Sequence, residues 1–176
     1  MGSGPPRDVL VVDRPEQLKA LGHPLRLRVL ETLGAQDEKP LTNRELAERV
    51  GVDPGHLHFH VRMLLRAGLI ERADAEGSRE KPYRSVARTV RIRPDLLASG
   101  LSKDVRAAML DQVQRGFAEY GPAGLFRTAQ LTVRMPLEQA LELIAEFADR
   151  AQTYDDPAAE PVVITAFAHP PSGGAE

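Results

Sequence analysis

Two predicted helices joined by a very short turn constrain the fold of this chain more than any other feature. The first helix spans residues 43–50, starts with a capping box at Thr42 and ends at Gly51. The second spans residues 54–67, with Asp53 as its N-cap and a proline in its first turn. Because the link between the two periodic segments is only residues 51–54, the last of which already begins the second helix, the sequence predicts a helix, a tight turn and a second helix.

The second helix has two chemically different faces when its residues are placed about 100° apart. One side carries Leu57, Val61 and Leu64, with His60 at its border. The other side carries Phe59, Arg62 and Arg66, flanked by His56 and His58. The first side is predicted to pack into a core, and the second side is predicted to face outward.

Two further helices are predicted before this pair. Asp13 is expected to cap a short helix that ends at residues 22–24, which read Gly-His-Pro. A longer helix follows over residues 24–33, with apolar residues at helical spacing. Arg26 falls on another face of this helix, close to its N-terminus.

A β-hairpin is predicted directly after the second helix of the tight pair. Its strands span residues 69–74 and 81–87, around a polar tip at residues 75–80. A hairpin in this position is a wing, so the first half of the chain is predicted to be a winged helix-turn-helix. Positive charge at or near the tip comes from Arg79, Lys81 and Arg84.

The second half of the chain combines a long apolar helical stripe with strand patterns. The stripe runs from Leu101 to Tyr120 and is expected to form a dimer core. Strands are predicted over residues 129–135 and 162–168, with a helix over residues 137–148 between them. The predicted fold class is therefore α+β and mainly helical: a winged helix-turn-helix domain, then a helical and strand-helix-strand region for dimerisation or effector binding.

Charge follows the same division of the chain. The predicted parts are a flexible segment (1–12), a winged helix-turn-helix domain (13–93), a dimerisation region (94–170) and a disordered tail (171–176). Residues 14–93 carry a net charge of +5 and residues 94–176 one of −6, although the whole chain carries only −2. This asymmetry indicates a polyanionic partner for the first half alone.

Composition excludes several classes of function. The chain has no cysteine, which removes disulfides, thiolate metal ligands and cysteine nucleophiles. No apolar run approaches the roughly 18 residues of a membrane span, and no signal peptide is recognised, so we expect a cytoplasmic protein without membrane contacts. No nucleophile, base and orienting group can be assembled, and no glycine-rich cofactor loop occurs, so no enzymatic activity, cofactor or metal is predicted.

Two segments resemble the ArsR-type winged helix-turn-helix regulators: residues 20–33, ALGHPLRLRVLETL, and residues 60–70, HVRMLLRAGLI. The resemblance implies a homodimeric bacterial regulator, usually a repressor, that docks one recognition helix per subunit in the major groove of operator DNA. The cysteine-bearing motif of metal-sensing members is absent from residues 43–50, and the region after residue 93 is longer than in small members. The sequence therefore resembles the extended, metal-independent branch.

Twelve residues are the candidate DNA contacts. Alignment with that family assigns the base contacts to Gly55, His56, His58, Phe59 and Arg62, and gives His60 a packing role. Arg62 is expected to contact guanine, and Phe59 is expected to contact a thymine methyl group. Phosphate contacts are expected from Arg79, Lys81 and Arg84 of the wing and from Arg26, Thr42, Asn43 and Arg44 at helix N-termini.

Several alternatives stay open at this point. In one, the domain is a protein-protein interaction module, and its basic helix binds an acidic protein instead of DNA. In another, the regulator responds to a metal ion chelated by His56 and His60, which lie four positions apart. In a third, His56 or His58 contacts DNA better when protonated, which predicts stronger binding as the pH falls through about 6.5. An unidentified small-molecule effector of the second half is also left open.

Overall fold

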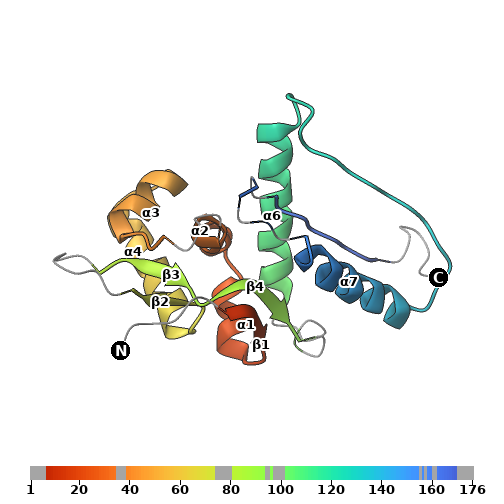
Figure 1. Ribbon diagram of the computed structural model, residues 1–176, viewed down its shortest axis with the longest axis horizontal. Helices are drawn as coiled ribbons and strands as arrows, with labels where there is room; N and C mark the ends of the chain where they lie inside the picture. Colours follow the sequence, from red (N-terminus) through yellow and green to blue (C-terminus); the bar gives the residue numbers. More distant parts are fainter. Residues whose placement is uncertain are drawn as a thin grey trace. The chain divides into compact units, whose positions relative to one another are not determined.

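The computed structural model describes most of the chain and divides it into two compact units (Figure 1). The described residues are 7–34, 39–73, 81–93, 96, 102–154, 156, 158–159 and 162–169. Unit one comprises Met1–Glu119, and unit two comprises Tyr120–Glu176. The predicted tail, residues 171–176, lies outside the described residues.

Unit one is built from helices and two small sheets. Its elements are β1 (Arg7–Val12), α1 (Pro15–Leu21), α2 (Pro24–Gly34), α3 (Asn43–Val50), α4 (Pro54–Arg66), β2 (Ile70–Arg72), β3 (Tyr83–Ser85), β4 (Ala87–Ile92) and α6 (Lys103–Tyr120), which ends one residue into unit two. The antiparallel pair β2–β3 contacts α4 through β2 and α2 through β3, and α3 packs on both helices (Figure 1). Unit one thus has the predicted α+β winged helix-turn-helix architecture.

Local hydrogen bonds at the predicted caps fix the tight helix pair. The Glu45 amide donates to Thr42 Oγ1 (3.3 Å), and the Thr42 amide donates to Glu45 Oε2 (2.7 Å), which completes a capping box. Gly51 ends α3 with a φ of 68°, a conformation that glycine adopts without steric cost. Asp53 Oδ1 accepts from two amides of the first turn of α4, one of them that of Gly55 (2.8 Å). Both helices match their predicted bounds to within one residue.

The helices of unit one share one core among the described residues. Leu18 of α1, Val29 of α2, Leu46 of α3 and Leu57 of α4 are all completely buried. Val105 of α6 joins the same core and is 1% exposed. Full burial of a side chain of this size contributes roughly 1.5–3 kcal/mol. The core therefore determines which face of each helix is left for other contacts.

Helix α6 begins as part of the winged-helix unit. Val105 and Ala108 are buried in its first turns. A Cβ atom at Gly22 would lie 2.8 Å from the Cβ of Asp104, so α6 closely approaches the link between α1 and α2. The structure therefore places the boundary between the units later than the expected position after residue 93. The apolar stripe was recognisable in the sequence, but the core that it faces was not.

The N-terminal segment, expected to be flexible over residues 1–12, contains a strand. β1 pairs in parallel with β4, and Val12 lies opposite Ile92. Val12 is completely buried, which anchors the strand to the core of unit one. The expectation was therefore wrong for residues 7–12, whereas residues 1–6 lie outside the described residues. Parallel partners 80 positions apart leave no local signal in the sequence.

The predicted cap of the first helix was also wrong. The N-cap of α1 is Arg14, whose side chain makes no capping bond. Asp13 instead lies one residue further from the helix, and its amide donates to Gln17 Oε1 at 3.3 Å. The bond therefore runs from the backbone before α1 to a side chain of the helix, whereas the predicted bond ran from the Asp13 side chain to a backbone amide of the helix.

The wing is present and is shorter than predicted. β2 and β3 pair antiparallel, with Ile70 opposite Ser85. Tyr83 of β3 also forms an isolated bridge with Leu41, just before α3, which ties the wing to the helix pair. The predicted tip, residues 75–80, lies outside the described residues.

Unit two contains the predicted helix but neither predicted strand. α7 (Leu137–Gln152) covers and extends the expected residues 137–148. Residues 129–135 and 162–168 have no strand structure, and alternating apolar side chains such as Leu131 are exposed. The alternating pattern was misleading because a strand also needs a partner, and these described segments pair with none. No helix in the described part of the chain is long and apolar enough to cross a membrane.

Candidate nucleic-acid interface

Helix α4 presents a mixed aromatic and basic face to solvent. Leu57, Val61 and Leu64 are completely buried, which leaves the opposite side of the helix uncovered. The exposed residues there are His56, His58, Phe59 and Arg62, which we call the outward face of α4. Phe59, the phenylalanine of α4, is 63% exposed and lies next to the exposed histidine at position 58. The predicted division of this helix is confirmed.

Gly55 directly precedes the outward face and leaves room for the side chain that caps α4. A Cβ at this position would lie 3.0 Å from Asp53 Oδ1, closer than an ordinary van der Waals contact. The absence of a side chain at Gly55 therefore leaves space for the bonds by which Asp53 caps α4. The structure places Gly55 at the exposed start of the helix, as predicted.

The start of α3 contributes one exposed cation to this side of the domain. Arg44 is exposed, but the Thr42 hydroxyl is occupied by its bonds with Glu45. The side-chain amide of Asn43 donates to the carbonyl of Pro54 at 2.9 Å, which ties α3 to the first residue of α4. Thr42 therefore caps α3 and Asn43 ties α3 to α4, whereas the side chain of Arg44 is exposed at the start of α3.

Arg26 does not lie on the surface, which contradicts the predicted phosphate contact. Its side chain is buried, and its guanidinium donates to the carbonyl of Ala20 and, at 2.9 Å, to that of Lys19. Nη1 also contacts the sulfur of Met63 on α4 at 3.5 Å. Arg26 thus binds the last turn of α1 to α2 and α4. Helix spacing placed it away from the leucines of α2, but could not show that other helices cover it.

Within the described part of the wing, one of the predicted cations is exposed and one is paired. Lys81 is exposed. Arg84 makes a salt bridge of 2.6 Å with Glu71 on the neighbouring strand, and little of its side chain is exposed. This cross-strand pair stabilises the hairpin and neutralises the arginine. Arg79 lies outside the described residues.

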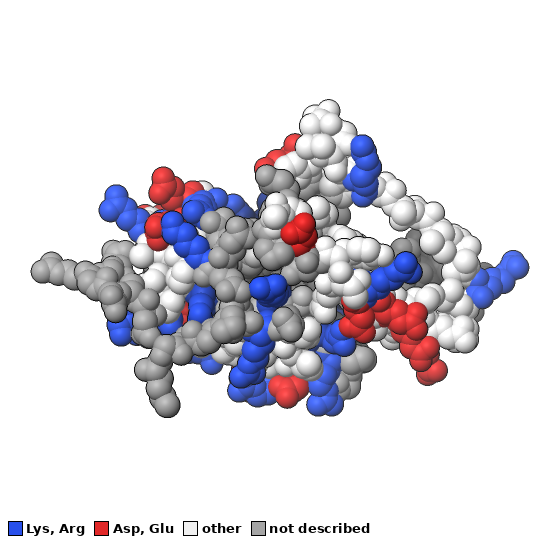
Figure 2. All heavy atoms as spheres, viewed as in Figure 1, with Lys and Arg blue, Asp and Glu red and all other residues white. Residues whose placement is uncertain are grey.

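Charged side chains are distributed unevenly over the two units. In Figure 2, Lys and Arg side chains are spread over the elements of the winged helix, and acidic side chains gather along α7. The carboxylates of α7 are Glu138, Glu142, Glu146 and Asp149. The predicted separation of a basic first half from an acidic second half is visible in the folded units.

Three histidines form a cluster that extends from the outward face of α4, through His56, toward the core. The ring centroid of His60 lies 4.4 Å from that of His23 and 5.1 Å from that of His56. Burial and then the neighbouring His23 and Arg26 lower the pKa of His60 to about 4. His60 is buried as expected, but the position of His23 was not predicted. The available signal was the Gly-His-Pro sequence that interrupts the first two helices.

The alternative of a metal site finds no support in this cluster. Among the described residues, no group of three or more histidine, cysteine, aspartate or glutamate side chains has an arrangement that could hold a metal ion. Nδ1 of His23 is engaged with the Leu25 amide, at 3.1 Å. The cluster is therefore better described as packed rings than as a set of ligands.

Comparison with known proteins agrees with this architecture. The chain matches the model of a helix-turn-helix domain. The match covers residues 21–73. The matched segment contains α2, α3, α4 and β2, so the helix-turn-helix domain includes the whole outward face of α4. No curated protein is significantly similar to the chain.

Several solved structures are similar to the chain at low identity. M. tuberculosis Rv0081 is 24% identical, with 63% of this chain and 91% of that chain covered and a TM-score of 0.35. The transcriptional regulator PA3341 is 26% identical, with 72% and 80% covered and a TM-score of 0.32. MepR, a transcription regulator of a Staphylococcus aureus multidrug efflux pump, is 16% identical, with 80% and 78% covered and a TM-score of 0.29. The fold assignment rests on the helix-turn-helix domain and on the elements described above.

Proposed function

We propose that this chain is a sequence-specific DNA-binding transcription regulator of the ArsR type, which inserts α4 into the major groove. The observation that carries the proposal is the outward face of α4, where Phe59 is 63% exposed beside Arg62 while the opposite face is completely buried. An exposed aromatic ring on a cationic helix is favourable when the helix docks against an anionic partner that also offers apolar groups. The major groove offers both phosphates and thymine methyl groups.

The side chains around α4 divide between base contacts and phosphate contacts. In this proposal Arg62 donates two hydrogen bonds to a guanine, and Phe59 packs against a thymine methyl group. Arg44 and Lys81, both exposed, contact phosphates on either side of the groove. Arg26 and Arg84 take no part, because their guanidinium groups are already bonded within the protein.

The proposed regulator acts as a homodimeric repressor. Support for a dimer comes from apolar side chains that unit two leaves exposed, such as Leu141, Phe147 and Val162. Two copies of α4 would read two half-sites about 10 base pairs apart. Repression itself follows from the resemblance to the ArsR type, in which occupation of the operator blocks transcription.

Binding to the DNA upstream of the chain's own gene tests the proposal. Fluorescence anisotropy compares that fragment with a shuffled fragment of equal length, for the unmodified chain and for Arg62→Ala. Loss of a bidentate base contact worth about 1–3 kcal/mol should weaken specific binding about 5- to 150-fold and affect the shuffled fragment less. Lys103→Ala is the matched control, because it removes one exposed positive charge outside the helix-turn-helix domain.

Two results would count against the proposal. Equal binding of both fragments by the unmodified chain would remove sequence specificity. Unchanged affinity of Arg62→Ala would remove α4 as the reading element. Absence of DNA binding together with retention of an acidic protein by the same face of α4 would favour the protein-interaction module instead.

A further inference from the structure

The histidine cluster lies where α4 is attached to the rest of unit one. His60 is 5% exposed and points from α4 toward the link between α1 and α2, where His23 meets it ring to ring. His56, one turn earlier on α4, is the third member. The cluster therefore connects the helix that carries the outward face to the start of α2.

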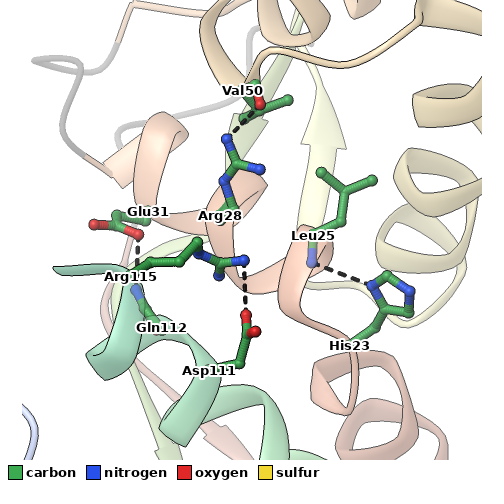
Figure 3. Close-up of polar contacts among 8 residues, drawn as sticks. All are labelled: His23, Leu25, Arg28, Glu31, Val50, Asp111, Gln112 and Arg115. Carbon is green, nitrogen blue, oxygen red and sulfur yellow. Dashed lines mark hydrogen bonds and ion pairs between the residues drawn. The ribbon is translucent and has the colours of Figure 1, made fainter. Parts of the chain in front are cut away.

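His23 makes a hydrogen bond that requires an unprotonated ring nitrogen. Its Nδ1 accepts from the amide of Leu25 at 3.1 Å, in the first turn of α2 (Figure 3). A neutral histidine can accept at one nitrogen, whereas a protonated one donates at both. Protonation of His23 at Nδ1 must therefore break this bond and leave the Leu25 amide without its partner.

His60 has no acceptor ready for an additional proton. Its Nδ1 is buried and has no hydrogen-bond partner among the described residues. The buried guanidinium of Arg26 is held nearby by the carbonyls of Ala20 and Lys19. A positive charge on His60 would thus lie near the fixed positive charge of Arg26. Burial, His23, Arg26 and His56 all disfavour that charge, and burial has the largest effect.

One acidic group faces the cluster from α6. Asp111 favours a proton on His23, but its carboxylate is also bound to Arg115, at 2.7 Å (Figure 3). Burial, Arg26 and His56 act in the opposite direction and outweigh it, so that the pKa of His23 lies below its ordinary value. Burial, together with the charges on α2 and α4, therefore keeps His23 and His60 neutral at neutral pH, and Asp111 on α6 opposes this effect at His23.

We propose that the His23–His56–His60 cluster is a proton-sensitive joint that holds α4 against α2 while neutral and releases α4 when it is protonated. Protonation of His23 breaks its bond with the Leu25 amide, and protonation of His60 adds charge next to Arg26, so both effects loosen the contact between α4 and the start of α2. The consequence for DNA affinity rests on the proposed function, whereas the consequence for the attachment of α4 does not.

The direction of the pH effect follows from His60. Its pKa is about 4 in the folded protein and 6.5 in an ordinary environment. The unfolded chain therefore takes up the proton first as the pH falls. The folded state keeps its full stability above about pH 6.5 and loses it progressively toward pH 4. From His60 alone, the equilibrium constant for folding should fall about 30-fold between pH 8 and pH 5.

Hydrogen exchange in the intact chain tests the joint without DNA. Peptides from α4 and α3 are compared at pH 8 and pH 5, after correction for the intrinsic exchange rates. We expect the protection of α4 to fall at least tenfold more than that of α3. His60→Gln should remove this difference, whereas His58→Gln, an exposed residue of the same helix outside the cluster, should preserve it.

A second measurement covers the case in which His60→Gln does not fold. An NMR titration of the histidine rings in the unmodified chain should show His60 protonating below pH 5, together with the loss of α4 protection. A His60 ring that titrates near pH 6.5, or α4 protection that does not depend on pH, would overturn the proposal.

DNA binding separates this proposal from the proposed function. Affinity for the upstream fragment should fall between pH 7.5 and pH 5 in the unmodified chain and in His169→Gln, which changes an exposed histidine outside the helix-turn-helix domain, but less in His60→Gln. A rise in affinity as the pH falls would favour direct contact between protonated histidines and DNA, and would overturn the joint as the dominant pH effect. If no DNA binds at any pH, the proposed function fails, but the result from hydrogen exchange stands.

Discussion

At the scale of single residues, nearby positions on α4 differ sharply in burial. Leu57 is completely buried, whereas Phe59, two positions further, is 63% exposed. Leu57 contributes to the stability of the fold, and Phe59 contributes to the surface that the fold presents. Substitutions at these two positions should therefore separate folding from binding.

We expect Leu57→Ala to lower the free energy of unfolding by about 2–5 kcal/mol, because it leaves a cavity in the core. Phe59→Ala should change stability by no more than about 0.5 kcal/mol, as other exposed substitutions do, and should weaken operator binding. Urea unfolding and DNA titration measure the two quantities. A large loss of stability in Phe59→Ala would mean that the ring is packed in solution.

Arg26 and Arg44 form a second contrasting pair. Arg26→Met should lower the midpoint of thermal unfolding, because the buried carbonyl of Ala20 loses its charged donor, at about 1–3 kcal/mol for a buried group left unpaired. The carbonyl of Lys19 keeps the amide of Gly22 as a donor. Arg26→Met should leave the dependence of DNA affinity on salt unchanged. Arg44→Ala should have the opposite effects. Its thermal midpoint should equal that of the unmodified chain, and the slope of log affinity against log salt concentration should be smaller in magnitude by about 1. If Arg26→Met also reduced this dependence on salt, the original prediction that Arg26 contacts a phosphate would be correct.

At the scale of elements, Gly22 governs how closely α6 approaches the winged helix. Gly22→Ala would bring a Cβ within 2.8 Å of the Asp104 Cβ, so α6 must shift. We expect a loss of about 1–3 kcal/mol, typical of overpacking, and faster hydrogen exchange in the first turns of α6. Gly34→Ala is the matched control, since nothing lies within 4 Å of its Cβ position. Equal stability of the two variants would contradict the close approach.

Elements with local signals were predictable from the sequence, and elements with distant partners were not. Thr42 and Asp53 mark the starts of α3 and α4 within a few residues of chain, and both caps are present in the structure. The pairing of β1 with β4 and the contact between Arg26 and Met63 depend on residues far away in sequence. The strands predicted at 129–135 and 162–168 are absent for the same reason. Alternating apolar residues indicate which face of a strand would be buried, but they do not show that a partner strand is present.

At the scale of the whole molecule, the described core of unit one contains no residue of unit two. Among the described residues, every member of that core and every apolar residue packed on it precedes Leu110. Unit two keeps apolar side chains such as Leu143 and Tyr154 exposed. Stability and assembly should thus depend on different parts of the chain.

We expect a chain that ends after Tyr120 to unfold cooperatively near the midpoint of the full-length protein. It should also sediment as a smaller species and bind operator DNA more weakly, because the proposed dimer loses apolar surface. Calorimetry and analytical ultracentrifugation measure these properties. A truncated chain without a cooperative transition would show that the core of unit one requires unit two.

The parallel pairing of β1 with β4 also bears on the order in which the protein forms during synthesis. The partner of each β1 residue lies 80 positions later, so β1 emerges from the ribosome well before the strand that completes it. At about 5–20 residues per second, this delay lasts roughly 4–16 seconds. The four helices between them can form during that interval from short-range contacts, whereas the edge closed by β1 joins last.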